Sequence, residues 1–378
     1  MRFTKYLVFP LLAVLCGCGK FFVDTTNPPG STGNIIYIAN SQASSVAGFS
    51  VSTTAGTLTA LNNGNTFSVA AGPTTLVATP SGSFLYVGGQ SGNIVAYTIN
   101  ADGTITAVNN GSPVASGFSP TSMVIDSTGT WLLAVDGISG SIFEFQINAT
   151  TGVLTAANPA TIPLDQPASP SQVYITPNNQ FAYVALQTGG VDVFTFNSTS
   201  GALTNRLLLK PTTGTGGPNA DLAVLADPNT KFLFVGETGI NAVRVFTIGT
   251  GGALVEVSGS PFTTGAGPSA FAMDSTGSFL YVATRGAGKI SGFSLGVNGT
   301  LTALSSSPFT AGTFTSVTGP QTMTLDPSGK FLAVVSAGGG PDLQIFSFDA
   351  ATSGKLDSVA TASTGSDPVQ AVAVTAVK

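Results

Sequence analysis

Histidine is absent from all 378 residues, which excludes a Ser-His-Asp triad, a histidine metal site and an imidazole base. Charged residues are scarce, at 8% of the chain against roughly 25% in typical soluble domains. The two cysteines, Cys16 and Cys18, lie close together near the amino terminus, so no disulfide framework is expected. Stretches rich in Ala, Glu, Lys and Leu are also missing, which argues against a helical protein.

The residues that are abundant favour β-structure. Glycine occurs 47 times, and Ser, Thr, Asn and Val are frequent. This composition is typical of short strands that are joined by tight turns. We therefore expect an all-β protein.

The amino terminus has the pattern of a bacterial lipoprotein signal. Arg2 and Lys5 precede an apolar stretch, Leu7–Leu15, that is too short to span a bilayer. The sequence that follows resembles a lipobox, with cleavage after Gly17 and lipidation of Cys18. We expect a signal peptide over residues 1–17 and a lipidated tether over residues 18–33. The alternative is an ordinary secretory signal that is cut nearby.

Lipidation would make the membrane a partner of this chain. Two acyl anchors on Cys18 give stable attachment without a transmembrane helix. Gly19, in place of Asp, follows the cysteine, and by resemblance to lipoprotein sorting this indicates the outer membrane. Loss of the signal leaves 10 basic against 17 acidic side chains, so nucleic acid is not expected as a partner.

The rest of the chain consists of seven copies of one unit, which is its strongest structural signal. Each copy holds a short apolar stretch that contains at least one aromatic residue. The seven stretches are Ile35–Ile38, Phe84–Val87, Trp131–Ala134, Phe181–Val184, Phe232–Val235, Phe279–Val282 and Phe331–Val334. Their spacing of about 50 residues is typical of a four-stranded blade with its connections. We interpret the aromatic side chains as core packing between stacked blades.

Turn residues mark the strands within each unit. A proline opens the strand before the apolar stretch in later copies, and turns such as Asp126–Gly129 and Asp326–Gly329 join the two strands. Asn179 can replace the glycine of this turn, because Asn tolerates positive φ. Asp227–Thr230 departs from the pattern, and we expect a different turn there.

The two ends of the repeat indicate how the structure closes. Ile35–Ile38 has no proline-led strand before it, and Pro368–Val374 has no aromatic strand after it. The two strands can pair with each other if the chain closes into a ring in which Pro368–Val374 becomes the innermost strand of the first blade. A linear solenoid would instead need atypical polar caps. The sequence therefore predicts a seven-bladed β-propeller of four-stranded antiparallel blades over residues 34–378, closed by the carboxy-terminal strand.

Such a disc has two unequal faces. The loops between first and second strands, and between third and fourth strands, form what we call the turn face. The remaining connections form the loop face, which carries the variable polar segments and surrounds the mouth of the central channel. We predict that polar side chains there bind a sugar-like small molecule or a protein. The candidate ligand-binding residues are Gln90, Asp136, Gln172, Gln187, Asn219, Asp221, Gln321, Asp342 and Gln370.

Two charges on this face, Glu237 and Arg285, belong to adjacent units of a chain with few charges. They are the candidate catalytic residues, as a carboxylate and a guanidinium that converge on one ligand. The alternative is an ion pair between blades or two solvated loop charges. Phosphate-loop and EF-hand spacings are missing, so we expect neither a cofactor nor a metal.

The repeated Phe-Leu-Tyr-Val, with Asp-Pro-Ser-Gly before it and Gly-x-Leu-Thr after it, resembles the seven-bladed lactonase family and the related YVTN-repeat surface propellers. The family includes the propeller-type 6-phosphogluconolactonases, and the likeness covers roughly residues 34 to 374. Lactonase relatives often show Gly-Pro-Arg-His before a strand that ends in Asn-Glu. Here Glu237 matches the Glu, whereas Asn219 and Ala220 replace the Arg and the His.

The loss of both basic groups leaves little to activate water or to stabilise an oxyanion. Our leading hypothesis is therefore a lipid-anchored, non-catalytic binding or surface scaffold of the cell envelope. The competing hypothesis is a lactone hydrolase, similar to the 6-phosphogluconolactonases, that uses Glu237 and Arg285.

Overall fold

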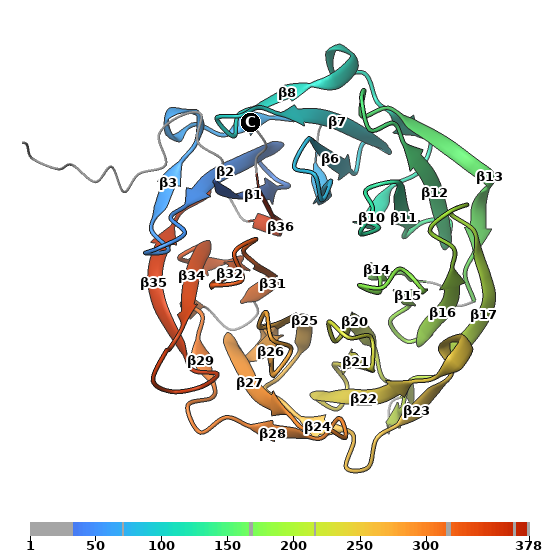
Figure 1. Ribbon diagram of the computed structural model, residues 1–378, viewed down its shortest axis with the longest axis vertical. Helices are drawn as coiled ribbons and strands as arrows, with labels where there is room; N and C mark the ends of the chain where they lie inside the picture. Colours follow the sequence, from blue (N-terminus) through green and yellow to red (C-terminus); the bar gives the residue numbers. More distant parts are fainter. Residues whose placement is uncertain are drawn as a thin grey trace, which may run out of the picture.

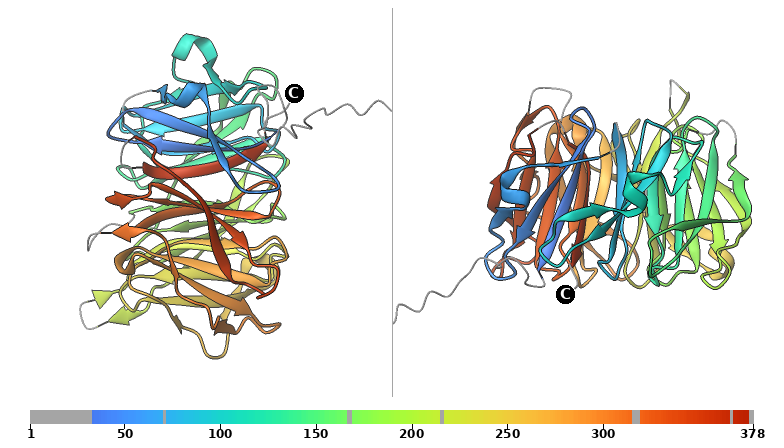
Figure 2. Two further views of the ribbon diagram at one scale, coloured as in Figure 1. Left: turned by 90° about the vertical axis from the view of Figure 1, so that its left-hand side faces the viewer. Right: turned by 90° about the horizontal axis from the view of Figure 1, so that it is seen from above.

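The computed structural model describes residues 33–69, 72–165, 169–214, 217–314, 319–365 and 368–375. Seven antiparallel sheets of this part of the chain stand as blades around a central axis (Figure 1). Seen edge-on, the blades form a disc with two faces (Figure 2). The signal peptide, Cys18 and the tether up to residue 32 lie outside the described residues.

Each blade has four strand positions, which we give in order from the first to the seventh blade. The innermost strands are β36 (Pro368–Thr375), β5 (Pro73–Ala78), β10 (Pro120–Ile125), β14 (Gln172–Ile175), β20 (Asp221–Ala226), β25 (Pro268–Met273) and β31 (Pro320–Leu325). The second strands are β1 (Asn34–Asn40), β6 (Phe84–Gly89), β11 (Trp131–Asp136), β15 (Phe181–Ala185), β21 (Phe232–Glu237), β26 (Phe279–Thr284) and β32 (Phe331–Ser336).

The outer half of each blade is less regular. The third strands are β2 (Ser45–Val51), β7 (Asn93–Ile99), β12 (Ser141–Ile147), β16 (Val191–Phe196), β22 (Ala242–Ile248), β27 (Lys289–Leu295) and β34 (Leu343–Phe348). The outermost strands are β3 (Leu58–Ala60) with β4 (Phe67–Ser68), β8 (Ile105–Ala107) with β9 (Ala115–Ser116), β13 (Leu154–Pro163), β17 (Leu203–Leu209), β23 (Leu254–Glu256) with β24 (Phe262–Thr263), β28 (Leu301–Ala303) with β29 (Phe309–Thr310), and β35 (Leu356–Ala362).

Short elements decorate the loops. Two small hairpins pair β18 (Thr213–Gly214) with β19 (Gly217–Pro218), and β30 (Thr313–Phe314) with β33 (Gly339–Gly340). The 3-10 turns are η1 (Asn62–Gly64), η2 (Val108–Gly111), η3 (Thr250–Gly252) and η4 (Arg285–Ala287). No helix in the described ranges has the length and apolar character needed to cross a membrane.

The ring closes as the sequence predicts. Strand β36 pairs antiparallel with β1, with Ile36 opposite Ala373 and Tyr37 opposite Val372. The innermost strands follow one another around the axis, and β31 of the last blade contacts β36 of the first. Because Asn34 lies opposite Thr375, β1 begins and β36 ends on the turn face. Closure pairs two strands that would otherwise be exposed sheet edges.

The aromatic stripe of the second strands is core, as predicted. Tyr37, Tyr86, Tyr183 and Tyr281 each have 0% of their surface exposed. Blades bury both faces of these strands, and this accounts for their continuous apolar sequences. Separate clusters of buried apolar side chains lie between neighbouring blades, and they hold the disc together.

The turns between first and second strands confirm one prediction and correct another. Asn179 has φ 55° and replaces the usual glycine, as expected. The prediction of a different turn at Asp227–Thr230 is wrong. Thr230 takes φ 55° and donates its N–H to the Asp227 carbonyl at 2.8 Å, as Gly129 does to Asp126 at 2.9 Å. The Asp227 carboxylate accepts the N–H groups of Lys231 and Phe232, and these bonds hold a β-branched residue in the left-handed region.

Candidate functional site

Buried charges of the loop face gather in the fifth blade, where it adjoins the fourth. The register of β20 and β21 places Asp221 directly opposite Glu237. The next strand, β22, carries Arg244 in an otherwise apolar stretch, opposite Val235. Three ionisable side chains from consecutive strands are thus brought together inside the protein.

Glu237 is fully buried, and its carboxylate is occupied by bonds within the protein. Oε1 accepts the backbone N–H of Thr212 at 2.6 Å, and Oε2 accepts the Thr212 hydroxyl at 2.5 Å. The guanidinium of Arg244 lies 3.6 Å from Oε1. Thr212 belongs to the connection from the fourth to the fifth blade. Glu237 therefore fastens this connection onto the fifth blade.

Arg244 is held on several sides, and it has only 7% of its surface exposed. Its Nε and Nη2 donate to the two carboxylate oxygens of Glu256 at 3.1 and 2.9 Å, and Nη1 donates to the Lys210 carbonyl at 2.9 Å. Burial opposes ionisation of Glu256, but hydrogen bonds from Arg244 and Ser260 hold its pKa below its usual range. Such a bidentate pair has a fixed geometry, so Arg244 is not free to follow a ligand.

Asp221 differs from the other acids of the face because its carboxyl is unsatisfied. The residue has 0% exposure, and neither carboxyl oxygen has a hydrogen-bond partner among the described residues. Burial, and then the charge of Glu237, raise its pKa to about 8, so Asp221 carries a proton at neutral pH. Its backbone forms a reciprocal bridge to Gln187 of the fourth blade, at 3.0 and 3.1 Å.

Arg285 does not join this cluster. It lies exposed in η4, on the sixth blade, and within the described ranges no ion pair connects it with Glu237. The cation beside Glu237 is Arg244, which the sequence analysis did not select. The predicted convergence of Glu237 and Arg285 is therefore not formed in this structure, and a catalytic role for either residue stays a prediction.

The two other predicted carboxylates also hold loops in place. Asp136 accepts N–H groups of Ser119, Ile138 and Ser139 at 3.0–3.2 Å. Burial opposes its ionisation, but these hydrogen bonds outweigh that effect and lower the pKa of Asp136. The Asp342 carboxylate accepts the N–H of Thr364 at 2.7 Å. Each acid ties a connection between blades to its own blade, as Glu237 does.

The predicted amide side chains are divided between the channel wall and the loops. The Oε1 atoms of Gln172 and Gln370 accept the N–H groups of Val224 and Leu76, each at 2.8 Å, and so link successive innermost strands. Asn219 Nδ2 donates to the Thr212 hydroxyl at 2.7 Å, and Gln321 Nε2 donates to the Gly319 carbonyl at 3.4 Å. Gln187 bridges Asp221 through its backbone, and Gln90 is exposed.

The central channel holds a polar cavity of about 180 Å³, with Gln172, Gln321 and Gln370 among its lining residues. Hydroxyls on its wall donate to carbonyls of the next blade, and these bonds run from Thr74 to Pro120 at 2.6 Å, from Thr121 to Pro170 at 3.0 Å, from Ser171 to Leu222 at 3.0 Å and from Ser269 to Pro320 at 3.2 Å. Ligand pockets usually enclose about 300–1,000 Å³. The cavity thus lies below this range, and sugar binding at the channel mouth stays a prediction.

The chemistry available at this face is limited. No cluster of three or more Asp, Glu, Cys or His side chains that could hold a metal occurs within the described ranges. Three of the predicted acids, Glu237, Asp136 and Asp342, are engaged within the protein, as are most of the predicted amides, and the fourth acid, Asp221, is fully buried. Charges inside apolar strands, such as Arg244 in Val243–Val245, were the signal in the sequence that could have located the cluster.

Comparisons with known proteins agree with the seven-bladed architecture. The sequence profile described as "Lactonase, 7-bladed beta-propeller" matches residues 30–118 and 97–370. A comparison with curated protein sequences found none that matches.

Solved structures with the same architecture share little sequence with this chain. A candidate 6-phosphogluconolactonase from Bacteroides uniformis superimposes with a TM-score of 0.74 at 15% identity, covering 91% of this chain and 100% of the other. A periplasmic gluconolactonase from Pseudomonas aeruginosa gives 0.72 at 16%, covering 92% and 100%. A protein from Lactobacillus plantarum gives 0.70 at 21%, covering 91% and 99%. At such identities the likeness concerns the fold alone.

Proposed function

The chain belongs to the lactonase family of seven-bladed β-propellers, and from this premise we propose that it is a binding scaffold of the cell envelope that does not hydrolyse lactones. The observation that carries the proposal is the state of Glu237. This residue matches the family's glutamate, but it is fully buried and bonded to Thr212 and Arg244.

Lactone hydrolysis needs a group that activates water and donors that stabilise the developing oxyanion. The chain has no histidine, and Asn219 and Ala220 stand where relatives carry Arg and His. The Asn219 side chain donates to Thr212, so it is already used within the loop. Glu237 and Asn219 are therefore both engaged within the protein, and neither is free to contact a substrate in this structure.

Family membership favours one alternative, a lactone hydrolase that uses Glu237 and Arg285. Glu237 would first have to exchange its bonds with Thr212 for contact with the channel. Arg285 would then have to reach it from the neighbouring blade. The channel cavity, at about 180 Å³, is also below the usual range for ligand pockets.

A lactonase assay separates these two functions. The purified full chain is incubated with glucono-δ-lactone and with 6-phosphogluconolactone, beside the Pseudomonas gluconolactonase as a positive control. We expect the chain to hydrolyse neither lactone above the rate in buffer. Turnover comparable to that of the control would reject the scaffold in favour of the enzyme.

We also propose that Cys18 carries the lipid that attaches the scaffold to the outer membrane. Because β1 begins on the turn face, the tether would meet the disc there and leave the loop face turned outward. Cell fractionation tests the anchor. The wild-type chain should remain with outer-membrane vesicles after a salt wash, whereas Cys18→Ala should be released. Release of both would indicate an ordinary secretory signal.

A further inference from the structure

A cleft on the turn face, between the second and third blades, offers about 460 Å³, which is within the usual range for ligand pockets. We propose that this cleft binds a neutral carbohydrate. The inference rests on the binding role proposed above, and it adds a site and a ligand class. It places ligand binding on the face opposite to the one that the sequence analysis selected.

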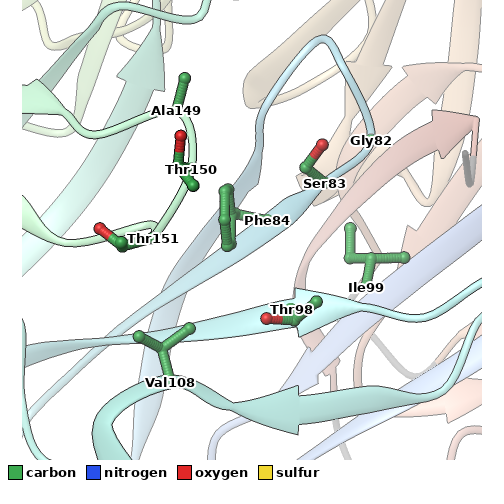
Figure 3. Close-up of a pocket in the computed structure, with 9 residues that line it drawn as sticks. All are labelled: Gly82, Ser83, Phe84, Thr98, Ile99, Val108, Ala149, Thr150 and Thr151. Atoms are coloured by element: carbon green, nitrogen blue, oxygen red, sulfur yellow. The ribbon is translucent and has the colours of Figure 1, made fainter.

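The walls of the cleft carry hydroxyl groups from two blades. Thr98 lies near the end of β7, and Thr150 lies on the turn between β12 and β13. Both residues are exposed, and neither hydroxyl has a hydrogen-bond partner within the described ranges. Figure 3 shows Thr98 and Thr150 on either side of Phe84. Hydroxyls can both donate and accept, as the hydroxyls of a sugar require.

Apolar side chains form the floor between these hydroxyls. Phe84, Ile99 and Val108 line the cleft and come from β6, β7 and η2 (Figure 3). A sugar ring has C–H groups on its faces and hydroxyls around its edge. Phe84 and Ile99 have only 6% and 5% of their surface exposed and Val108 is half-buried, so the apolar contact for a C–H face is small and the flanking hydroxyls carry most of the proposed recognition.

The absence of charge in the lining makes the cleft selective for neutral ligands. None of its nine lining residues is ionisable. A second cleft of the turn face, of about 500 Å³ beside the seventh blade, is lined by Asp274, Lys330 and Asp349 among others. A phosphorylated or carboxylated sugar would lose hydration in the first cleft without gaining an ionic partner.

The cleft is held in shape before any ligand arrives. The ring of Phe84 packs on Gly152, where an added Cβ would lie 2.6 Å from it. The Tyr86 hydroxyl donates to the Gly152 carbonyl at 2.9 Å and ties the turn that carries Thr150 to the second blade. A rigid site loses little conformational entropy on binding, which favours recognition of a ligand by few contacts.

Affinity electrophoresis tests the proposal with defined probes. The full chain is run through gels that contain dextran, laminarin or galactomannan, which are neutral, or alginate, which is anionic. We expect retardation by at least one neutral polysaccharide. The double variant Thr98→Val/Thr150→Val keeps the shape of the cleft and removes its free hydroxyls, and should weaken binding at least tenfold.

A matched control carries the same changes at equivalent positions of other blades. Thr247 lies opposite Phe232 in the fifth blade, as Thr98 lies opposite Phe84, but its hydroxyl donates to the Val255 carbonyl at 3.3 Å. Thr199 lies on the turn of the fourth blade that corresponds to the turn of Thr150. The Thr199→Val/Thr247→Val chain should be retarded like the wild type. Absence of retardation by every neutral polysaccharide, equal weakening in both variants, or retardation by alginate alone would overturn the proposal. The lactonase assay is independent, so hydrolysis would reject the proposed function without bearing on this cleft.

Discussion

The ring of Phe331, on the seventh blade, lies against Gly56, on the first blade. A Cβ added to Gly56 would lie 2.6 Å from Phe331 Cε1, and Gly56 has φ +67°. The same contact joins a residue at or next to the start of each second strand to a glycine of the next blade. The other six pairs are Ile35 with Gly103, Phe84 with Gly152, Trp131 with Gly201, Phe181 with Gly252, Phe232 with Gly299 and Phe279 with Gly354. A single packing rule thus runs around the whole ring.

Substitution at Gly56 tests this rule at the closure. Gly56→Ala adds a clash with the Phe331 ring to the cost of positive φ, and we expect a loss of roughly 2–4 kcal/mol in the free energy of unfolding. Gly64→Ala is the matched control, because Gly64 also has positive φ (+83°) but an added Cβ would meet nothing within 4 Å. It should lose only about 1 kcal/mol. Equal losses in urea unfolding would contradict the packing rule.

Tyrosine hydroxyls give a second test of how blades are joined. Tyr86 donates to the Gly152 carbonyl at 2.9 Å, whereas the buried Tyr183 hydroxyl has no partner within the described ranges. Tyr86→Phe removes a hydrogen bond and should destabilise the protein by about 1 kcal/mol. Tyr183→Phe removes only an unsatisfied hydroxyl, so it should be neutral or stabilising. The reverse order of melting temperatures would show that these hydroxyl assignments are wrong.

The protonated state of Asp221 predicts a pH dependence of stability. Its pKa in the folded protein, about 8, lies above the ordinary value of 3.8. Between these values the folded chain holds a proton that the unfolded chain has released. The free energy of unfolding should therefore decrease as pH rises through this window, by up to about 1.4 kcal/mol per pH unit. Urea unfolding of Asp221→Asn at pH 5, 7 and 9 should show a flatter dependence than the wild type.

Two other acids, Glu144 and Asp136, also affect how the free energy of unfolding depends on pH. Burial raises the pKa of Glu144 to about 7, so a part of the slope should persist in Asp221→Asn. Asp136 has the opposite shift, because hydrogen bonds lower its pKa against the effect of burial. Asp136→Asn should therefore lose the stability that the wild type shows above the ordinary pKa of Asp. It should leave unchanged the decrease in unfolding free energy that Asp221 causes as pH rises from 3.8 to about 8. If the free energy of unfolding decreases equally with pH in the wild type and in Asp221→Asn, then Asp221 is ionised in the folded protein throughout this pH range.

The sequence predicts the ring because its repeats specify local structure and closure together. In the repeat pattern Pro368–Val374 and Ile35–Ile38 each lack a partner strand, so the pattern predicts that they pair with each other, and they do so in the structure. Turn chemistry was predictable except at Thr230, where bonds to Asp227 outweigh the preference of a β-branched residue. Local propensity alone does not contain that effect.

The site was less predictable, because its groups are brought together by register between strands. Glu237 and Asp221 were selected as polar residues of one face, but their burial depends on Thr212 and on the blades around them. Arg244 is not among the predicted site residues, since it lies within strand β22 and not in a loop. A charge inside an apolar strand needs a buried partner, and this rule would have pointed to the pair with Glu237.

The most direct test of the account compares wild type and Glu237→Gln in the same preparation, by lactone turnover and by urea unfolding. We predict that neither protein hydrolyses glucono-δ-lactone above the rate in buffer, and that the variant loses about 1–3 kcal/mol of unfolding free energy because the bonds to Thr212 and Arg244 weaken. Turnover by the wild type that disappears in an equally stable Glu237→Gln chain would show that Glu237 is a catalytic residue, and the account would be wrong.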